Sequence, residues 1–395
     1  MQRTAETQRA WTGAALWSRG FRPFFLGAAV WAALAVAIWP WVWTGRATIP
    51  TAFSAVDWHV HEMIFGYGAA VVAGFLLTAV PNWTGRLPVA GRPLAALSAL
   101  WLTGRLAVFT SAWTGAAAAA LVDAAFLAVF FAVVLREVIA AKNGRNVKVA
   151  ILVGLLALAN IGFHVEAIRT GTATYATRSG LAGLAFLVLL IGGRVVPSFT
   201  HTWLARLGRT ARPVPFGRAD GVVMGVSATA LVGWIGVPEN AVAGLVLLAA
   251  GIVNLWRLSR WQGAATWSDR LVFVLHVGFF FAALGFVAAG LHALRPDLVS
   301  AAIAVHVWAI GAIGVMTLAM MTRATLGHSG QRLAATPLTQ FAYAAVVVAL
   351  AARLGMELLP AIMLPCLFVA AGAWVAGFAA FLIGYGSLLL RPPTA

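Results

Sequence analysis

Histidines are the residues of this chain best suited to do chemistry. His59 and His61, followed by Glu62, open a long apolar run in the stretch DWHVHEMIFGYG. His164 and His306 lie in two other apolar runs. Each alone fits a neutral imidazole bonded to a neighbouring helix, but imidazole is also the commonest protein ligand for iron and copper. Because all four are expected in the outer half of a membrane, we predict that they converge on a redox metal or a haem.

The spacing of His59 and His61 limits how the two can bind. On a regular helix, residues two apart point about 200° away from each other. His59 would then share its side with Glu62, and His61 would share its side with Phe65. We expect one histidine to face a cofactor and the other to face a second metal or a proton donor. An unwound segment, in which both histidines bind one metal, is the alternative.

Two glutamates are the candidate proton donors. Glu62 is expected one helical turn from His59 near the outer surface, and Glu166 lies two residues after His164. A carboxylate between water and a metal can deliver protons or act as an oxygen ligand. For Glu62 the alternative is a charge that stabilises a helix N-terminus.

A second constellation lies in the stretch HVWAIGAIGVMTLAMMTRATLGHSG. His306 is a candidate axial ligand of a haem, and Met320 is a candidate soft ligand for copper. Gly311 and Gly314 would give a flat macrocycle the clearance it needs. The alternative is that these glycines allow close helix contact and the methionine fills a gap.

Two arginines fall inside apolar runs, where an ionisable group needs a partner or a purpose. Arg194, in GGRVVPSFT, has no acidic neighbour in sequence. It fits either a side chain that reaches back to the membrane surface or a partner for a haem propionate. For Arg105 we expect a structural ion pair with Asp123 of the next run.

Composition shows which elements must position these side chains. Apolar residues make up 62% of the 395 residues and charged residues 10%, which a soluble domain cannot accommodate. A bilayer core needs about 20 apolar residues per spanning helix, and no run alternates as a barrel strand would. We therefore predict an all-α polytopic integral membrane protein with about twelve transmembrane helices. The runs cover 23–43, 58–82, 93–111, 114–140, 147–168, 178–200, 219–236, 239–257, 268–293, 298–325, 337–354 and 357–390.

The net charge of +16 is concentrated in alternate loops, as the positive-inside rule requires. Both termini are therefore expected on the cytoplasmic side. Positive charge so placed sets orientation and contacts the lipid bilayer, and no nucleic acid is expected as a partner. The single cysteine excludes an intramolecular disulfide. We expect one transmembrane domain over residues 1–395, with a weak midpoint at the inner loop 201–218.

Three stretches resemble hallmark sequences of the NnrS family: WHVHEMIFGYGAAVVAGFLLTAVPNWTGR, GGRVVPSFT and MTLAMMTRATLGHSGQR. The resemblance extends along the chain, including ANIGFHVEA around His164 and LHVGFFFAALGF around His276. It implies a bacterial inner-membrane protein of the nitric oxide and nitrosative-stress response that contains haem and copper. The matching positions with implied roles are His59, His61, Glu62, His164, Arg194, His276 and His306.

The residues and the family resemblance together predict haem b and a second metal, either copper or non-haem iron, as cofactors. The candidate metal ligands are His59, His61, His164, His276, His306 and Met320. The candidate cofactor-binding residues are His61, His306, Arg194, Gly311 and Gly314. Glu62 and Glu166 are the candidate catalytic residues.

Three functions fit these residues. A nitric oxide reductase-like enzyme would bind nitric oxide and reduce it to nitrous oxide. A sensor or scavenger would bind it at a haem without turnover. A proton-coupled secondary transporter fits less well, because mid-membrane carboxylates are scarce. The chain has no GxGxxG or CxxCH motif, so a reductase would need quinol or an external electron donor.

Overall fold

The structure is a computed structural model that describes residues 11–142 and 144–392. Its regular elements are all helices, with no strand among the described residues. Eleven of them are long and apolar enough to cross a membrane. Helices are required there because a bilayer core offers no partner for backbone N–H and C=O groups. The protein is therefore an all-α polytopic membrane protein, as predicted. Both termini lie outside the described residues.

Every predicted apolar run forms a helix, but one of the twelve is not apolar enough to be a candidate membrane span. The run predicted over 93–111 forms α5 (Arg92–Phe109), which is not among the candidate spans. Arg92 and Arg105 lower the mean hydropathy of its 18 residues. Arg105 is nonetheless buried, because it has partners on neighbouring helices.

The chain divides into two compact units. Unit 1 comprises residues up to 180, 324–332 and those from 381 onward, and unit 2 comprises 181–323 and 333–380. The loop 201–218 therefore lies within unit 2. The single-domain organisation stays a prediction.

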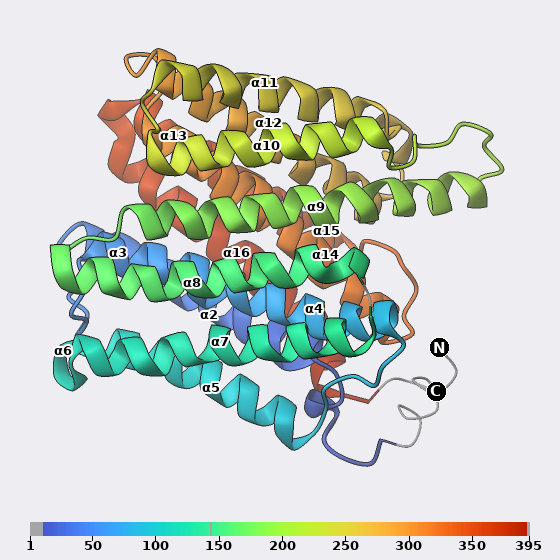
Figure 1. The fold of residues 1–395 in the computed structure, drawn as a ribbon, viewed down its shortest axis with the longest axis horizontal. Helices are drawn as coiled ribbons and strands as arrows, with labels where there is room; N and C mark the ends of the chain where they lie inside the picture. Colours follow the sequence, from blue (N-terminus) through green and yellow to red (C-terminus); the bar gives the residue numbers. More distant parts are fainter. Residues whose placement is uncertain (1–10, 143, 393–395) are drawn as a thin grey trace. The chain divides into compact units, whose positions relative to one another are not determined.

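Unit 1 is built on seven main elements, most of which are labelled in Figure 1. They are α2 (Phe21–Trp43), α3 (Ala55–His61), η2 (Glu62–Gly68), α4 (Ala69–Thr84), α5, α7 (Ala116–Ala140) and α8 (Val147–Thr170). The short α6 (Ser111–Thr114) joins α5 to α7. Within the unit, α2 packs on α4 and η2, while α7 packs on α5 and α8. Phenylalanines such as Phe24 and Phe126 are fully buried in this core.

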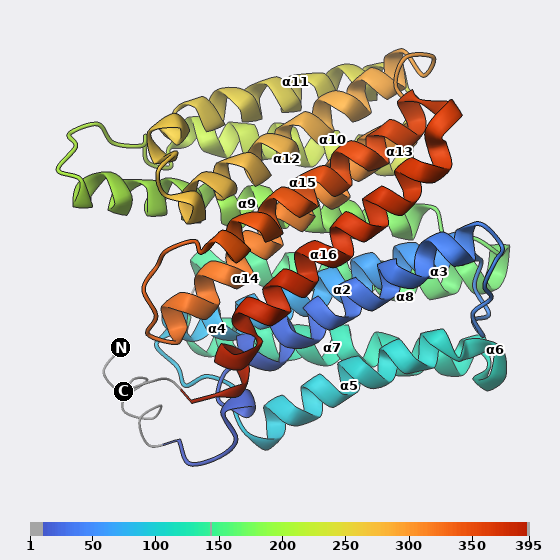
Figure 2. The ribbon, with the colours of Figure 1, turned by 180° about the vertical axis from the view of Figure 1, so that it is seen from behind.

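Unit 2 is best followed from the other side of the molecule, in Figure 2. Its elements are most of α9 (Tyr175–Arg206), α10 (Arg218–Gly236), α11 (Ala241–Ser259), α12 (Arg270–Leu294), α13 (Ala301–His306), η5 (Val307–Gly314), α14 (Val315–His328), α15 (Pro337–Leu358) and α16 (Met363–Leu390). Within the unit, α12 packs on α11 and η5, and η5 also contacts α15. The last residues of α14 and α16 belong to unit 1.

Two of the long spans change helix type in the same way. In Ala55–Thr84 the α-helix gives way to the π-helical η2 directly after His61, and in Ala301–His328 it gives way to the π-helical η5 directly after His306. A π-helix has a wider turn than an α-helix, so it changes the direction in which the following side chains point. Such segments often occur at functional sites.

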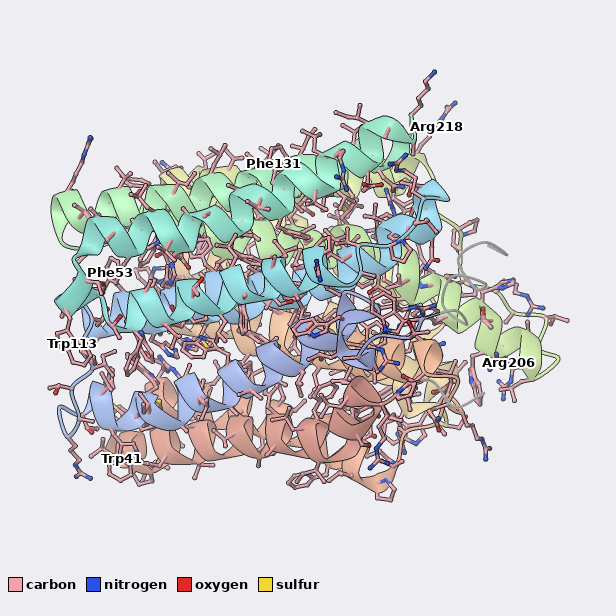
Figure 3. The ribbon with its side chains drawn as sticks, turned by 90° about the horizontal axis from the view of Figure 1, so that it is seen from below. Trp41, Phe53, Trp113, Phe131, Arg206 and Arg218 are labelled. Atoms are coloured by element: carbon pink, nitrogen blue, oxygen red, sulfur yellow. The ribbon has the colours of Figure 1, made fainter. Side chains whose placement is uncertain are left out.

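Exposed tryptophans mark one end of unit 1. Trp41 and Trp43 close α2, and Trp113 lies in α6; all three are exposed. Figure 3 shows Trp41 and Trp113 at the same end of this unit, together with Phe53. Tryptophan favours the membrane–water interface because its ring is apolar and its N–H is polar. This end of unit 1 therefore has the side chains of a membrane boundary.

Candidate metal centre

The short helix α3 sets the position of His61. Its N-cap, Ser54, accepts a hydrogen bond from the Asp57 backbone N–H at 3.0 Å and donates to the Asp57 carboxylate at 2.7 Å. The other oxygen of Asp57 accepts from the Ala173 N–H at 3.3 Å. The Ser54 side chain thus satisfies one free donor of the first turn, and Asp57 links the start of α3 to Ala173. His61, the last residue of α3, is fully buried.

Two imidazoles and one carboxylate meet in unit 1. The Nε2 of His61 lies 3.1 Å from Oδ2 of Asp123, and the Nε2 of His164 lies 2.8 Å from the same oxygen. One ligand atom from each residue lies within 4.8 Å of the others, and all three residues are buried. They come from α3, α7 and α8. Two histidines and one carboxylate form a donor set that suits non-haem iron, and nitrogen and oxygen ligands also suit copper(II).

A buried ion network supports this cluster. Arg105 donates through one guanidinium nitrogen to both oxygens of Glu62, each at 2.8 Å, and through another to Oδ1 of Asp123. Glu62 also accepts from the Trp31 indole at 2.6 Å and lies 3.0 Å from Nδ1 of His61. The predicted ion pair of Arg105 with Asp123 is confirmed. The network also includes Glu62, which was not expected as a partner of Arg105.

The charges of this network test whether a cation fits. Glu62 and Asp123 carry two negative charges, whereas Arg105 supplies one positive charge. A buried charge without compensation is strongly destabilising. Two sources can supply the missing positive charge. One is a proton on His61, both of whose ring nitrogens face acceptor oxygens, and the other is a metal cation between the histidines. The residues present therefore fit a cation at this place.

Asn160 completes the set of polar contacts. Its amide nitrogen donates to Oδ2 of Asp123 at 2.9 Å, and its carbonyl oxygen lies 3.1 Å from Nε2 of His61. Neither Asn160 nor Asp123 was predicted to be part of a metal site. The signal was present, because Asn160 and His164 are four residues apart on α8 and thus share a face. Two polar residues on one face of a membrane span call for a partner.

Aromatic rings surround the two imidazoles. The ring of Phe163 lies 4.8 Å from that of His61 between centroids, and Phe65 lies 5.3 Å away. Phe53 lies 5.6 Å from His164. The apolar rings keep water away and lower the local dielectric constant, which strengthens electrostatic interactions at the cluster.

The structure separates His59 from His61. Residues 55–61 are α-helical, so the segment is not unwound. The His59 ring stacks on Trp39 of α2 at 4.1 Å between centroids, while His61 faces α7 and α8. His59 is therefore not part of the group formed by His61, His164 and Asp123. Its role at a second metal stays a prediction.

The two candidate proton donors differ in their surroundings. Glu62, expected near water, is completely buried, and its oxygens contact Arg105, Trp31 and His61. Glu166 is half-buried, and its carboxylate accepts from the backbone N–H groups of Tyr175 and Ala176 at 3.0 and 3.1 Å. Glu166 thus satisfies free donors at the start of α9.

The remaining predicted residues belong to unit 2. The Nδ1 of His306 lies 2.7 Å from the Ala302 carbonyl. Because a carbonyl only accepts, Nδ1 carries the proton and Nε2 keeps the lone pair that an axial ligand needs. Arg194 in α9 and Met320 in α14 are half-buried.

The glycines of η5 lie against protein side chains. A Cβ at Gly311 would come within 2.9 Å of Phe281 and Leu350, and one at Gly314 within 2.8 Å of Trp374. These are the contacts expected of glycines that allow close packing. Contact with a macrocycle at either glycine stays a prediction.

His276 in α12 makes a defined hydrogen bond. Its Nε2 lies 2.8 Å from the Thr200 hydroxyl, which itself donates to the Val196 carbonyl at 2.9 Å. Nε2 of His276 therefore donates to the Thr200 hydroxyl oxygen. The other ring nitrogen, Nδ1, is buried beside Gly263 and makes no hydrogen bond among the described residues. Within the described part of the chain, His61, Asp123 and His164 are the one group with the spacing of a metal site.

Comparison with known proteins agrees with the hallmark stretches. No curated protein matches the chain. A family model described as NnrS protein matches residues 15–392, a range that includes every residue of the cluster around Asp123. Over nearly its whole length, the chain belongs to the NnrS protein family.

Proposed function

We propose that this protein binds nitric oxide at a metal held by His61, His164 and Asp123 and reduces it to nitrous oxide. Membership of the NnrS family indicates a role in the nitric oxide response. The observation that carries the proposal is the convergence of two imidazoles and a carboxylate from three helices at a buried place. Two nitric oxide molecules, two electrons and two protons give one nitrous oxide and one water. Quinol or an external donor would supply the electrons.

When bound, iron or copper would hold the nitrogen oxide and pass electrons to it. The chain's own residues supply the rest. His61 and His164 offer Nε2, and Asp123 offers Oδ2. Arg105 holds the other Asp123 oxygen, and Asn160 orients both the carboxylate and His61. Such supporting contacts fix ligand orientation, while the surrounding rings exclude water and admit a small neutral gas.

Proton delivery is assigned to Glu62 and Glu166. Glu62 touches Nδ1 of His61, the ring nitrogen opposite the one offered to the metal, so a proton would pass between Glu62 and this side of the ring. Glu166, half-buried near the end of α8, is the more accessible carboxylate. Glu62 would act beside the candidate ligand His61, and Glu166 would exchange protons with water.

Haem b is the second group of the proposal, and His306 would hold it. The bond of Nδ1 to the Ala302 carbonyl supports this role, since it fixes the tautomer that leaves Nε2 free to bind iron. Arg194 would pair with a propionate. His59, His276 and Met320 stay separate candidate metal ligands on the basis of residue type and family resemblance.

A second candidate function is binding without turnover, as a sensor or scavenger. Its support is the surroundings of Glu62: an ionised carboxylate fully buried among Arg105, Trp31 and His61 is held in place rather than poised to exchange protons. Under either function we place the protein in the bacterial inner membrane, with both termini cytoplasmic.

The two functions are distinguished by the product. Purified protein should show a Soret band, contain iron or copper, and convert nitric oxide to nitrous oxide when a quinol is supplied. Glu62→Gln should leave the haem spectrum unchanged and slow nitric oxide consumption, because it removes a titrating proton but keeps size. His292→Ala is the control, since His292 only bonds the Val299 carbonyl at 2.9 Å. Stoichiometric nitric oxide binding without nitrous oxide would establish the second function, and a colourless, metal-free preparation would refute both.

A further inference from the structure

A cluster of basic and hydroxyl side chains lies where α2 begins and α14 ends, within unit 1. Arg19 donates to Nδ1 of His328 at 2.8 Å, and the rings of Phe21 and His328 lie 5.5 Å apart. Because Nδ1 accepts from a guanidinium, His328 is neutral and does not add a charge. Arg19 forms no ion pair among the described residues. Its positive charge therefore faces no carboxylate of residues 11–142 or 144–392.

Arg22, one turn further on, is 1% exposed. One of its terminal nitrogens donates to the carbonyls of Leu388, Leu389 and Arg391 at the end of α16, at 3.0, 3.0 and 2.5 Å. Its Nε is buried and makes no hydrogen bond within the described chain. Burial, and then the charge of Arg22, lower the pKa of Arg19 to about 10. The two guanidinium groups are thus close enough to repel each other.

Two hydroxyl groups lie close to His328 at the end of α14. Thr325 is three residues before His328 and four before Ser329, the residue that follows α14, so Thr325 is a spatial neighbour of both. Thr325 and Ser329 are buried, at 0% and 2% exposed, and neither hydroxyl has a hydrogen-bond partner among the described residues. Buried donors are nearly always satisfied in folded proteins. Three unused donors, one on Arg22 and two next to the histidine that Arg19 contacts, indicate a missing acceptor with negative charge.

We propose that this basic cluster (Arg19, Arg22, Thr325, His328 and Ser329) binds a phosphate group at the membrane surface. Guanidinium groups match the geometry of phosphate oxygens, and hydroxyls donate to them. The cluster sits where α2 begins and where α14 and α16 end, which is the depth of lipid headgroups at the edge of a bilayer. The phosphate belongs either to an anionic lipid or to a free phosphate ion.

The test uses full-length protein in detergent and measures binding by native mass spectrometry and by the shift of the unfolding temperature. The probes are dioleoylphosphatidylglycerol, dioleoylglycerol, which lacks phosphate, and sodium phosphate against sodium chloride at equal ionic strength. Selective binding of phosphatidylglycerol would identify a lipid. Binding of sodium phosphate in its place would identify the free ion.

Three variants decide whether the cluster is responsible. Arg19→Gln should weaken binding about tenfold, because it removes a charge-assisted hydrogen bond. The double change Thr325→Val with Ser329→Ala keeps every charge and the side-chain size, and should weaken binding by a similar factor. Arg218→Gln is the control, because Arg218 is exposed at the start of α10 (Figure 3). Equal affinity in all variants, or equal binding of dioleoylglycerol, would overturn the proposal.

Discussion

The two π-helical segments begin alike and have different surroundings. His61, before η2 in unit 1, touches Glu62, Asp123 and Asn160 and is completely buried. His306, before η5 in unit 2, bonds a carbonyl of its own helix through Nδ1, and the Arg353–Glu357 ion pair lies near enough to interact with it electrostatically. The same backbone change therefore precedes direct contact with a fully buried ionic network in one unit, and a backbone hydrogen bond near a partly exposed ion pair in the other. The neighbouring helices, and not the π-helix, determine the chemistry of each histidine.

The glycines of the two segments differ in the same way. A Cβ at Gly66 in η2 would come within 2.8 Å of Glu62 and 2.9 Å of Arg105, so this glycine gives space to the ion network. Gly311 in η5 gives space to Phe281 and Leu350. Close approach serves charged groups at Gly66 in η2 and apolar packing at Gly311 in η5. Substitutions in matched pairs can test this contrast.

The largest contrast is expected between two arginines. Arg105→Met would leave two carboxylates buried without their counterion, so the free energy of unfolding should fall by about 3–5 kcal/mol. Arg353 pairs with Glu357 at 3.0 Å, but their side chains are 17% and 27% exposed, so Arg353→Met should cost no more than about 1 kcal/mol. Unfolding in mixed detergent measures both. Equal losses would show that burial does not distinguish the two pairs.

Ligand removal should separate the two histidine sites. His164→Ala should weaken metal binding in unit 1 by more than about 100-fold, since changes to supporting residues alone cost 10- to 100-fold. Asp123→Asn should act similarly. His306→Ala should instead lower haem content and leave that metal bound. Metal analysis and the Soret band report the two outcomes, with His292→Ala as the control. Loss of both groups in His306→Ala would mean that the sites are not independent.

A smaller effect is expected from Asn160→Ala, which leaves all three ligands in place. Metal affinity should fall about 10- to 100-fold, because the carboxylate and His61 lose a group that orients them. Asn254 is a matched control: it is also fully buried, and it donates to the Ser227 hydroxyl in unit 2 at 2.8 Å. Titration with copper or iron measures the change. An equal effect of Asn254→Ala would indicate a general loss of packing.

The smallest effect concerns the two glycines. Gly66→Ala and Gly311→Ala should each lower the free energy of unfolding by about 1 kcal/mol or somewhat more, since both added methyl groups meet close neighbours. Only Gly66→Ala should also weaken metal binding, because its neighbours are Glu62 and Arg105. Parallel unfolding and metal titrations distinguish the two. Unchanged metal affinity in Gly66→Ala would mean that the ion network does not control the ligands.

A sequence of this kind determines its helices almost completely. Each predicted run became a helix, because an apolar segment of about 20 residues has no other way to satisfy its backbone in a bilayer. The pairing of Arg105 with Asp123 was also predictable, since charges in apolar runs require partners. The divergence of His59 from His61 followed from the angular spacing of a regular helix. These properties depend on local sequence and on the solvent alone.

Only the tertiary structure decided which polar residues meet. His61, Asp123 and His164 come from three helices separated by about 40 to 60 residues along the chain, and whether they meet depends on how each helix is rotated and packed. The same packing buried Glu62, expected near water, and placed Asn160 against His61 and Asp123. The π-helical turn after His61 also changes side-chain directions in a way that a spacing of 3.6 residues per turn does not predict. The spacing of residues along one helix determines which side chains share a face. Which residues that face meets depends on how the neighbouring helices pack against it.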